Sequence, residues 1–179
     1  FRWDAGVDQT LFDDRIEMSA GYFGNTFDNL IDFSSSTFTY GNITAATSHG
    51  AEVFVAVRPV KGLQVHGNYT FTYATNDSTG RLLLQRPKHK VGGAVSYRLL
   101  DKATVNVDAV HVGERFDYGV PSRVKLEPYN LVNVAVSYNV TENLRLYCRA
   151  DNVLDENYEE VKGYGVAGIS GKAGFRVSF

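Results

Sequence analysis

The feature that most constrains this chain is a repeated alternation of apolar and polar residues with a period of two. In the stretch 63–73, for example, Val65, Tyr69 and Phe71 alternate with polar neighbours such as Gln64. In a β-strand, such alternation places the apolar side chains on one face of the sheet and the polar side chains on the other. The chain is therefore predicted to be all-β and antiparallel, with about nine strands. The segments with this pattern are 3–11, 16–22, 52–58, 63–73, 91–99, 103–109, 132–140, 144–150 and 172–179.

The connections between these segments differ in length in a regular way. Short turns on one side of a sheet and long loops on the other are the layout of outer-membrane β-barrels. A soluble β-sandwich also has alternating strands, but its strands rarely continue so regularly for about ten residues or more. The layout therefore favours a transmembrane β-barrel over a sandwich. The tight turns lie near residues 13, 60, 101 and 141, and the long links are 34–47, 75–87, 113–128 and 152–170.

Charge and composition narrow the class further. The formal net charge is -2 and the pI is about 6.1, so the chain lacks the basic surface that nucleic-acid binding requires, and no nucleic-acid partner is expected. The sequence has no run of about 18 apolar residues, which excludes a membrane helix. The first four residues, 1–4, lack the features of a signal peptide, so a targeting segment, if the protein is exported, is expected outside this sequence.

The polar face of the predicted strands carries several charged side chains. In the wall of a barrel these residues would point into a wet lumen, whereas in a soluble protein they would form the solvent face. They are Arg58, His66, Arg98, Asp108, Arg145, Arg149 and Arg176.

Several stretches then carry a resemblance to a known family. The stretch 21–33, which reads GYFGNTFDNLIDF, resembles a segment of TonB-dependent receptors in which a strand rises into an extracellular loop. Residues 40–42 and 49–52 look like the descending strand of the same family. Residues 86–89 are similar to its Arg-Pro-x-His entry to a strand. Residues 151–158 resemble its near-terminal Asn-Leu-Phe-Asp-x-x-Tyr motif, with Val and Leu in place of Leu and Phe.

This resemblance implies a fold and a function. Members of the family form barrels of about 22 strands with a plugged lumen. About nine strands cannot close such a wall, and unpaired strand edges are very costly in lipid, so residues 1–179 are expected to be the carboxy-terminal part of a longer barrel. The plug domain and the earlier strands are expected to be absent from the chain. The implied location is the outer membrane of a Gram-negative cell.

The implied activity is import rather than catalysis. The family takes up a scarce nutrient, such as an iron-siderophore or vitamin B12, with energy from the TonB complex, which would act through the absent plug domain. The implied partners are therefore outer-membrane lipid, the TonB complex and a metal-chelate or cobalamin-like ligand. A passive outer-membrane pore or structural barrel, and a soluble ligand-binding β-sandwich, remain as alternatives.

The last strand carries a candidate assembly signal. Lys172, Gly174, Val177 and Phe179 match a polar-x-Gly-x-x-apolar-x-apolar pattern at the end of the chain. By resemblance to outer-membrane proteins, the barrel-assembly machinery recognises this pattern.

Aromatic and basic residues in two long links are the candidate ligand contacts. Aromatic rings stack on ring-rich ligands, and guanidinium groups form charge-assisted hydrogen bonds with anions. Solvated loop residues are the alternative reading of the same positions. The candidates are Arg115, Tyr118 and Arg123 in the link 113–128, and Tyr158 and Tyr164 in the link 152–170.

The sequence predicts neither a catalytic site nor a cofactor. Its four histidines do not have metal-ligand spacing, and no nucleophile and base occur in a recognisable motif. The oxygen atoms of Asn25, Asp28, Asn29 and Asp32 suit calcium, but the receptor-like pattern already accounts for these residues. No metal site is therefore predicted.

Overall fold

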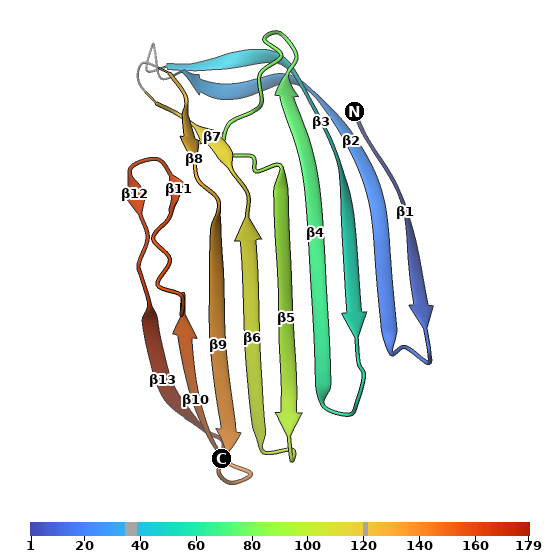
Figure 1. Cartoon of the computed structure of the whole chain (residues 1–179), viewed down its shortest axis with the longest axis vertical. Helices are drawn as coiled ribbons and strands as arrows, with labels where there is room; N and C mark the ends of the chain where they lie inside the picture. Colours follow the sequence, from blue (N-terminus) through green and yellow to red (C-terminus); the bar gives the residue numbers. More distant parts are fainter. Residues whose placement is uncertain (35–38, 120–121) are drawn as a thin grey trace.

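A computed structural model describes residues 1–34, 39–119 and 122–179 of the chain. Among these residues, no helix is long and apolar enough to cross a membrane. The described residues form one large antiparallel sheet of nine strands and two small hairpins (Figure 1). The strands of the large sheet are β1 (Arg2–Leu11), β2 (Ile16–Ser34), β3 (Thr39–Val57), β4 (Leu63–Asn76), β5 (His89–Leu99), β6 (Ala103–Val112), β9 (Tyr129–Asn139), β10 (Leu144–Asp151) and β13 (Ser170–Val177).

The nine strands follow one another across the sheet in chain order. Each strand pairs with the next in an antiparallel register, so that the chain runs up and down from one edge to the other. The short turns all lie at one end of the sheet and the long links at the opposite end, as Figure 1 shows. The predicted all-β architecture of about nine strands is confirmed. Within the described residues the sheet does not close, because β1 and β13 are its two edges.

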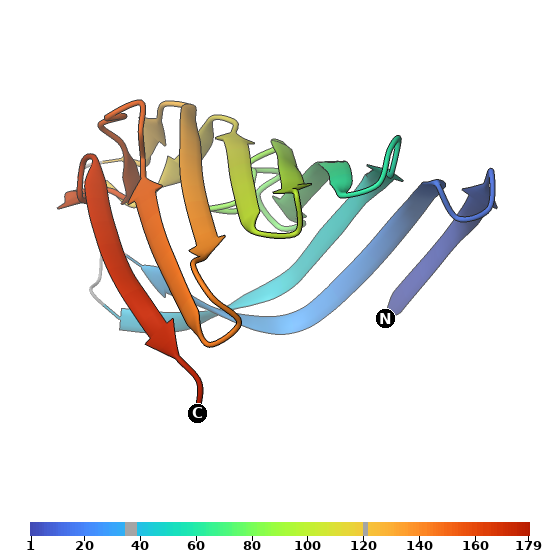
Figure 2. The same ribbon diagram turned by 90° about the horizontal axis from the view of Figure 1, so that it is seen from below.

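The sheet is curved, and Figure 2 shows the curvature from the end that carries the short turns. The inner face is identified by small residues that become buried where side chains converge. Ala46 and Ala56 on β3 and Ala74 on β4 are all buried, and they lie on the same face as the polar residues of their strands. The polar face is therefore the inner face of the sheet, and the alternating apolar residues lie on the outer face.

The outer face of the sheet is apolar, and large apolar side chains are exposed on every strand of it except β6. A large exposed apolar surface is unusual for a protein in water, where the largest patches cover only a few hundred Å². Here even a mid-strand residue such as Val53 has 42% of its surface exposed. The belt also includes Trp3, Val7, Met18, Tyr22, Val65, Tyr69, Val91, Val95, Tyr97, Tyr138, Leu146, Phe175 and Val177.

Aromatic rings mark the upper border of this outer belt. Trp3 and Tyr22 have ring centroids 5.7 Å apart, His49 lies 6.3 Å from Tyr22, and Tyr73 lies 5.5 Å from His49. The row continues to β5, where the Nδ1 atom of His89 lies 2.8 Å from the hydroxyl oxygen of Tyr69. An aromatic girdle of this kind is found where outer-membrane barrels meet the lipid-water interface.

Tyr97 and Tyr138 lie on the same outer face near the short turns. On β5, the outward residues between His89 and Tyr97 are Val91, Gly93 and Val95. At about 3.4 Å per residue, the separation of His89 and Tyr97 along the strand is about 27 Å. This is comparable to the height of the apolar band in outer-membrane barrels, which is about 25 Å.

The prediction of a long link at 34–47 is wrong for its described part. Strand β3 begins at Thr39, and its pairing with β2 continues as far as Ser34 and Thr39. Backbone pairing between two strands does not require strict alternation of apolar and polar residues, so this hairpin continues beyond the belt although its sequence reads as a loop. The upper parts of β2 and β3 bend across the top of the other strands, over the concave side of the sheet (Figures 1 and 2).

Two further links contain short hairpins. The link 113–128 holds β7 (Arg115–Asp117) and β8 (Val124–Leu126), and the link 152–170 holds β11 (Glu159–Val161) and β12 (Tyr164–Gly165). Both hairpins lie at the end of the sheet with the long links (Figure 1).

Candidate functional site

The candidate site is a cluster of three links at the end of the sheet opposite the short turns. We call it the outer loop cluster, and it consists of residues 77–88, the β7–β8 hairpin and residues 152–169. The link 77–88 docks onto the β7–β8 hairpin. The backbone N–H of Gln85 donates a hydrogen bond to the carbonyl oxygen of Phe116 at 2.7 Å, and Nη1 of Arg123 donates to the carbonyl oxygen of Leu82 at 3.0 Å.

Asp117 holds the three links of the cluster together. Its side chain is fully buried, with 0% of the residue exposed. One carboxylate oxygen accepts hydrogen bonds from Nε2 of Gln85 at 2.9 Å and from the backbone N–H of Tyr118 at 2.8 Å. The other oxygen accepts a hydrogen bond from the backbone N–H of Lys162 at 2.7 Å. A buried carboxylate is tolerated when hydrogen bonds replace its lost hydration, as they do here.

Arg115 lies beside this junction, and only 6% of its surface is exposed. Its Nη2 donates to the carbonyl oxygen of Glu159, and its guanidinium carbon lies 5.3 Å from the centre of the Tyr129 ring. Its Nη1 is buried and has no hydrogen-bond partner among the described residues. Arg115 therefore supports the link that contains β11 through a hydrogen bond, and it contacts the first residue of β9 through a cation–π interaction.

Two of the predicted ligand contacts meet around one tyrosine. Tyr158 stacks on Tyr129 with ring centroids 4.1 Å apart, and Arg115 contacts the same Tyr129 ring. Burial and the nearby carboxylate of Glu160 raise the pKa of the Tyr158 hydroxyl. The structure thus brings Arg115 and Tyr158 together around a residue that the sequence analysis did not select.

The other three predicted contacts occupy separate positions. Arg123 is half-buried, and its guanidinium carbon lies 5.6 Å from the centre of the Phe116 ring. Tyr118 is half-buried and follows Asp117 directly. Tyr164 is 74% exposed on β12, which makes it the most accessible of the five.

Ion pairs at the surface stiffen the two hairpins. Nζ of Lys125 lies 2.6 Å from the Glu114 carboxylate, and this hydrogen bond lowers the pKa of Glu114 and raises that of Lys125. On the β11–β12 hairpin, Nζ of Lys162 lies 3.0 Å from the Glu159 carboxylate. The hydrogen bond from Lys162 lowers the pKa of Glu159, as does the one that the Gly163 backbone N–H donates to it.

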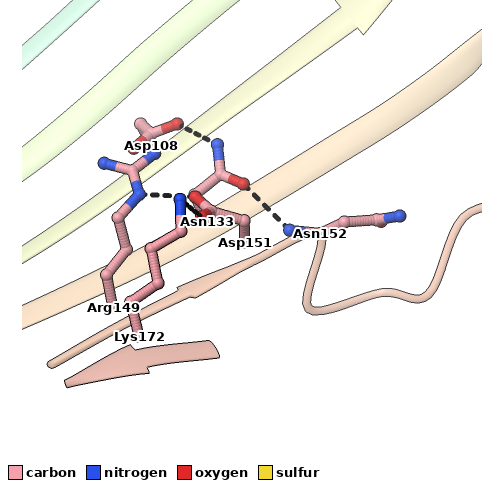
Figure 3. A network of polar contacts seen from close by, with 6 residues as sticks. All are labelled: Asp108, Asn133, Arg149, Asp151, Asn152 and Lys172. Atoms are coloured by element: carbon pink, nitrogen blue, oxygen red, sulfur yellow. Dashed lines mark hydrogen bonds and ion pairs between the residues drawn. The ribbon is translucent and has the colours of Figure 1, made fainter. Parts of the chain in front are cut away.

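Below the loop cluster, polar side chains form a network across the inner face of β6, β9, β10 and β13 (Figure 3). Nδ2 of Asn133 donates to the Asp108 carboxylate at 2.6 Å, and its Oδ1 accepts a hydrogen bond from the backbone N–H of Asn152 at 2.9 Å. On β10, Nε of Arg149 donates to the Asp151 carboxylate. The Lys172 ammonium lies 3.8 Å from the same carboxylate. The network joins the inner wall to the start of the last link.

Asn152 explains the motif 151–158 in physical terms. Its backbone has a φ of 51°, a left-handed conformation that asparagine adopts more readily than most residues. Its side chain is buried and bonds in both directions with the backbone of Glu156, at 2.9 Å for each hydrogen bond. Asp155 then accepts a hydrogen bond from the backbone N–H of Ile169, which closes the base of the link. The motif is a turn that fixes where the last link leaves the wall.

Asp117, Tyr129 and Asn152 are site residues that the sequence alone did not indicate. Asn152 stood inside the motif, but its role depends on a turn conformation that alternation does not reveal. Asp117 read as a charged loop residue because its burial arises from contacts with links distant in sequence. No group of three or more His, Cys, Asp or Glu side chains suited to a metal ion occurs in the described ranges. The side chains of Asn29 and Asp32 lie outside the described part of the structure.

Comparison with known proteins identifies the family to which this architecture belongs. The family described as TonB dependent receptor-like, beta-barrel matches residues 2–153. The vitamin B12 transporter BtuB of Vibrio cholerae is 30% identical over 158 residues, which are 85% of this chain and 25% of that protein.

Solved structures show the same fold. The ferripyoverdine receptor of Pseudomonas aeruginosa superposes with a TM-score of 0.82 at 23% identity, over 99% of this chain and 27% of the receptor. The ferric-catecholate import receptor Fiu of Escherichia coli K12 gives a TM-score of 0.80 at 22% identity, over 99% of this chain and 27% of that chain. This chain thus spans about a quarter of the length of the relatives that it matches.

Proposed function

Because this chain belongs to the TonB-dependent receptor β-barrel family, we propose that it forms the carboxy-terminal wall of an outer-membrane receptor that imports a scarce nutrient. The observation that carries the proposal is the exposed apolar outer face of the sheet, which lies opposite a polar inner face. Lipid covers the outer face in this proposal, and the inner face lines the lumen. The location is the outer membrane of a Gram-negative cell.

The remainder of the barrel and a plug domain come from parts of the protein beyond these residues. Residues 1–179 are one structural unit in this proposal, whose edge strands β1 and β13 pair with further strands. Pairing of both edges satisfies backbone groups that would otherwise face lipid without hydrogen bonds. TonB-derived energy reaches the receptor through the plug domain.

The ligand belongs to the iron-siderophore or vitamin B12 type. The related proteins support this range, because one is a vitamin B12 transporter and others are a ferripyoverdine receptor and a ferric-catecholate import receptor. Such a receptor is a transporter rather than an enzyme.

The outer loop cluster is the proposed entry site for the ligand. Tyr164 is the most exposed of the proposed contacts, and Tyr118, Arg123, Tyr158 and Arg115 lie deeper in the cluster. Aromatic rings and guanidinium groups together suit a ring-bearing or anionic metal chelate.

The last strand carries the proposed signal for the barrel-assembly machinery. Lys172, Gly174 and Val177 lie on β13, and Phe179 is the exposed residue at the end of the sequence. Gly174 lies opposite Tyr147, and a Cβ atom at Gly174 would lie only 2.5 Å from the Tyr147 hydroxyl oxygen. Glycine therefore leaves room for the Tyr147 ring.

The proposal is tested with the product of the complete gene. In this account, the protein partitions into outer membranes and migrates faster in a detergent gel before heating than after it, as folded barrels do. Cells that lack their own receptors then take up labelled cobalamin or an iron chelate when they express it. A protein that is folded and monomeric in plain buffer would contradict the membrane assignment.

A further inference from the structure

The guanidinium group of Arg115 is buried without a counter-ion. Only 6% of the residue is exposed, and within the part of the chain that the structure describes its Nη1 has no hydrogen-bond partner. The group makes a hydrogen bond from Nη2 to the carbonyl oxygen of Glu159 and a cation–π contact with the Tyr129 ring. Across the described residues, no carboxylate lies within ion-pair distance of Arg115. A buried charge is costly unless it is paired and hydrogen-bonded, so this guanidinium group lacks one interaction.

The loops of this chain enclose the Nη1 atom. Arg115 lies on β7 opposite Leu126 of β8, which is itself only 4% exposed, and Nη2 of Arg115 is bound to the link 152–169 through Glu159. A group from beyond these residues reaches Nη1 only if the loops move apart. The partner that Nη1 lacks is therefore expected within the outer loop cluster itself.

Two carboxylates that adjoin Arg115 are already engaged. Asp117, two residues further along β7, accepts three hydrogen bonds. The Glu159 carboxylate lies 3.0 Å from Nζ of Lys162 and accepts a hydrogen bond from the backbone N–H of Gly163 at 3.2 Å. Moving either carboxylate to Arg115 would leave its present donors without an acceptor.

Glu160 carries a carboxylate that can move. Its side chain is exposed, and among the residues that the structure describes no cationic group lies within ion-pair distance of it. The Tyr129 hydroxyl donates to its Oε1 at 3.5 Å, which is long for a hydrogen bond. The backbone nitrogen of Glu160 is bonded to the carbonyl carbon of Glu159, whose oxygen Arg115 binds. The Glu160 side chain thus begins beside the guanidinium group and ends at the tyrosine that Arg115 also contacts.

We propose that Glu160 is the counter-ion of Arg115 in a second, closed arrangement of the link 152–169. In this arrangement the Glu160 carboxylate leaves the Tyr129 hydroxyl and accepts a hydrogen bond from Nη1, and we call the pair the Arg115–Glu160 latch. The latch gains a charge-assisted hydrogen bond in a site that excludes water, and it costs the burial of the carboxylate. Because the gain and the cost oppose each other, the two arrangements differ little in free energy.

The latch controls the position of two proposed ligand contacts. This inference rests on the proposed function, in which the outer loop cluster is the entry site. Tyr158 lies two residues before Glu160 and stacks on Tyr129, and Tyr164 is exposed on the same hairpin. A ligand that touches these tyrosines more closely in the closed arrangement shifts the population toward closure. Arg115 is then a positioning residue that acts on the ligand through the link.

The test measures the position of the link in the purified full-length receptor in detergent, without added nutrient. Other cysteines are replaced with alanine, and spin labels are attached at Tyr164→Cys on β12 and at Ser78→Cys, an exposed position of the link 77–88. Double electron–electron resonance then gives the distance between the labels. With Glu160 in place, the latch predicts two distances. Glu160→Gln lowers the fraction of one of them about tenfold, the effect of losing one charge-assisted hydrogen bond.

Two further variants separate the latch from a general effect of charge. Glu127→Gln removes an exposed carboxylate next to β8 and leaves both distances as they are. Arg115→Met removes the guanidinium group but keeps an unbranched side chain at the buried position. In this background Glu160→Gln has no further effect on the distances, because the carboxylate has lost its partner.

The latch is overturned if the native receptor and Glu160→Gln give the same distances, or if Glu127→Gln changes them equally. It is also overturned if Glu160→Gln has its full effect in the Arg115→Met background. If Glu160→Gln changes nothing and Arg115→Met lowers the unfolding temperature, a group from beyond these residues completes the Arg115 site, which likewise overturns the proposal.

Nutrient uptake is scored separately, in whole cells that express the unlabelled receptor and are given labelled cobalamin or an iron chelate. Two distances that depend on Glu160, in a receptor that imports neither nutrient, contradict the proposed function and leave the latch standing. Uptake by a receptor with one distance, which Glu160→Gln does not alter, contradicts only the latch.

Discussion

At the residue scale, Asp117 is fully buried and accepts hydrogen bonds from Gln85, Tyr118 and Lys162. The sequence places these donors in separate links, and nothing in the local pattern indicates that they meet. The aromatic and basic candidates of the same links were predictable by residue type alone. Their burial, and hence which of them a ligand reaches first, depends on contacts between links that are distant in sequence.

Replacing Asp117 with Ala loosens all three links together. The substitution leaves the Gln85 amide and the Lys162 backbone N–H without an acceptor, which costs about 2 kcal/mol. Amide hydrogen exchange at Lys162 in the full-length receptor should therefore accelerate by roughly thirtyfold. Glu127→Ala, at an exposed position, is the control. A role for Asp117 as the shared anchor is contradicted if Asp117→Ala accelerates exchange only within the β7–β8 hairpin. It is also contradicted if the control accelerates exchange at Lys162 to the same extent.

The β11–β12 hairpin should lose order in acid. The hydrogen bond from Lys162 lowers the pKa of Glu159 below its ordinary value of 4.5. A carboxyl group whose pKa is lowered in the folded state stabilises the fold at pH values above its ordinary pKa. This stabilisation is lost as the pH falls through the lowered pKa. Amide exchange at Gly163, corrected for the intrinsic rate, should therefore rise as the pH falls below about 4.5. Glu159→Gln should abolish this pH dependence, and a profile that is the same in native protein and variant argues against the ion pair as its source.

At the scale of elements, alternation predicted the large sheet well. Each of the nine predicted segments lies within a strand of the large sheet or extends past its end by at most two residues, because the period of two reports directly which face of a strand is apolar. The extension of β2 and β3 could not be read in the same way. Their upper parts pair through the backbone as far as Ser34 and Thr39 although their sequence does not alternate strictly, as the consecutive apolar residues Leu30 and Ile31 illustrate.

The turn at the start of the last link depends on Asn152. Asn152→Ala removes both hydrogen bonds to the Glu156 backbone and places alanine in a left-handed conformation, for a combined loss of about 3 kcal/mol. The free energy of unfolding of the full-length receptor in urea should fall by this amount. Asn157→Ala, at an exposed position of the same turn, is the control. An equal and small effect of both substitutions means that the turn does not depend on the Asn152 side chain.

At the scale of the whole molecule, the medium that covers the outer face decides whether the sheet is a membrane wall. Val95 and Ser96 are neighbours on β5, and they point to the outer and inner faces respectively. Arginine at an outward mid-strand position costs about 2–4 kcal/mol in lipid, whereas on a lumen face it is tolerated. Val95→Arg should therefore lower the amount of folded full-length receptor in outer membranes, and Ser96→Arg should not. Equal yields of the two variants contradict a lipid-facing β5.

The most direct test uses Cys148, which lies on the outer face of β10 and is exposed in the isolated wall. Other cysteines of the full-length receptor are replaced with alanine, and native outer membranes are treated with a membrane-impermeant maleimide. We expect Cys148 to stay unlabelled until the protein is unfolded, because lipid covers it. A cysteine introduced by Tyr164→Cys in the outer loop cluster should react at once. Rapid labelling of Cys148 in the folded receptor would place the apolar face in water and contradict the proposed membrane wall.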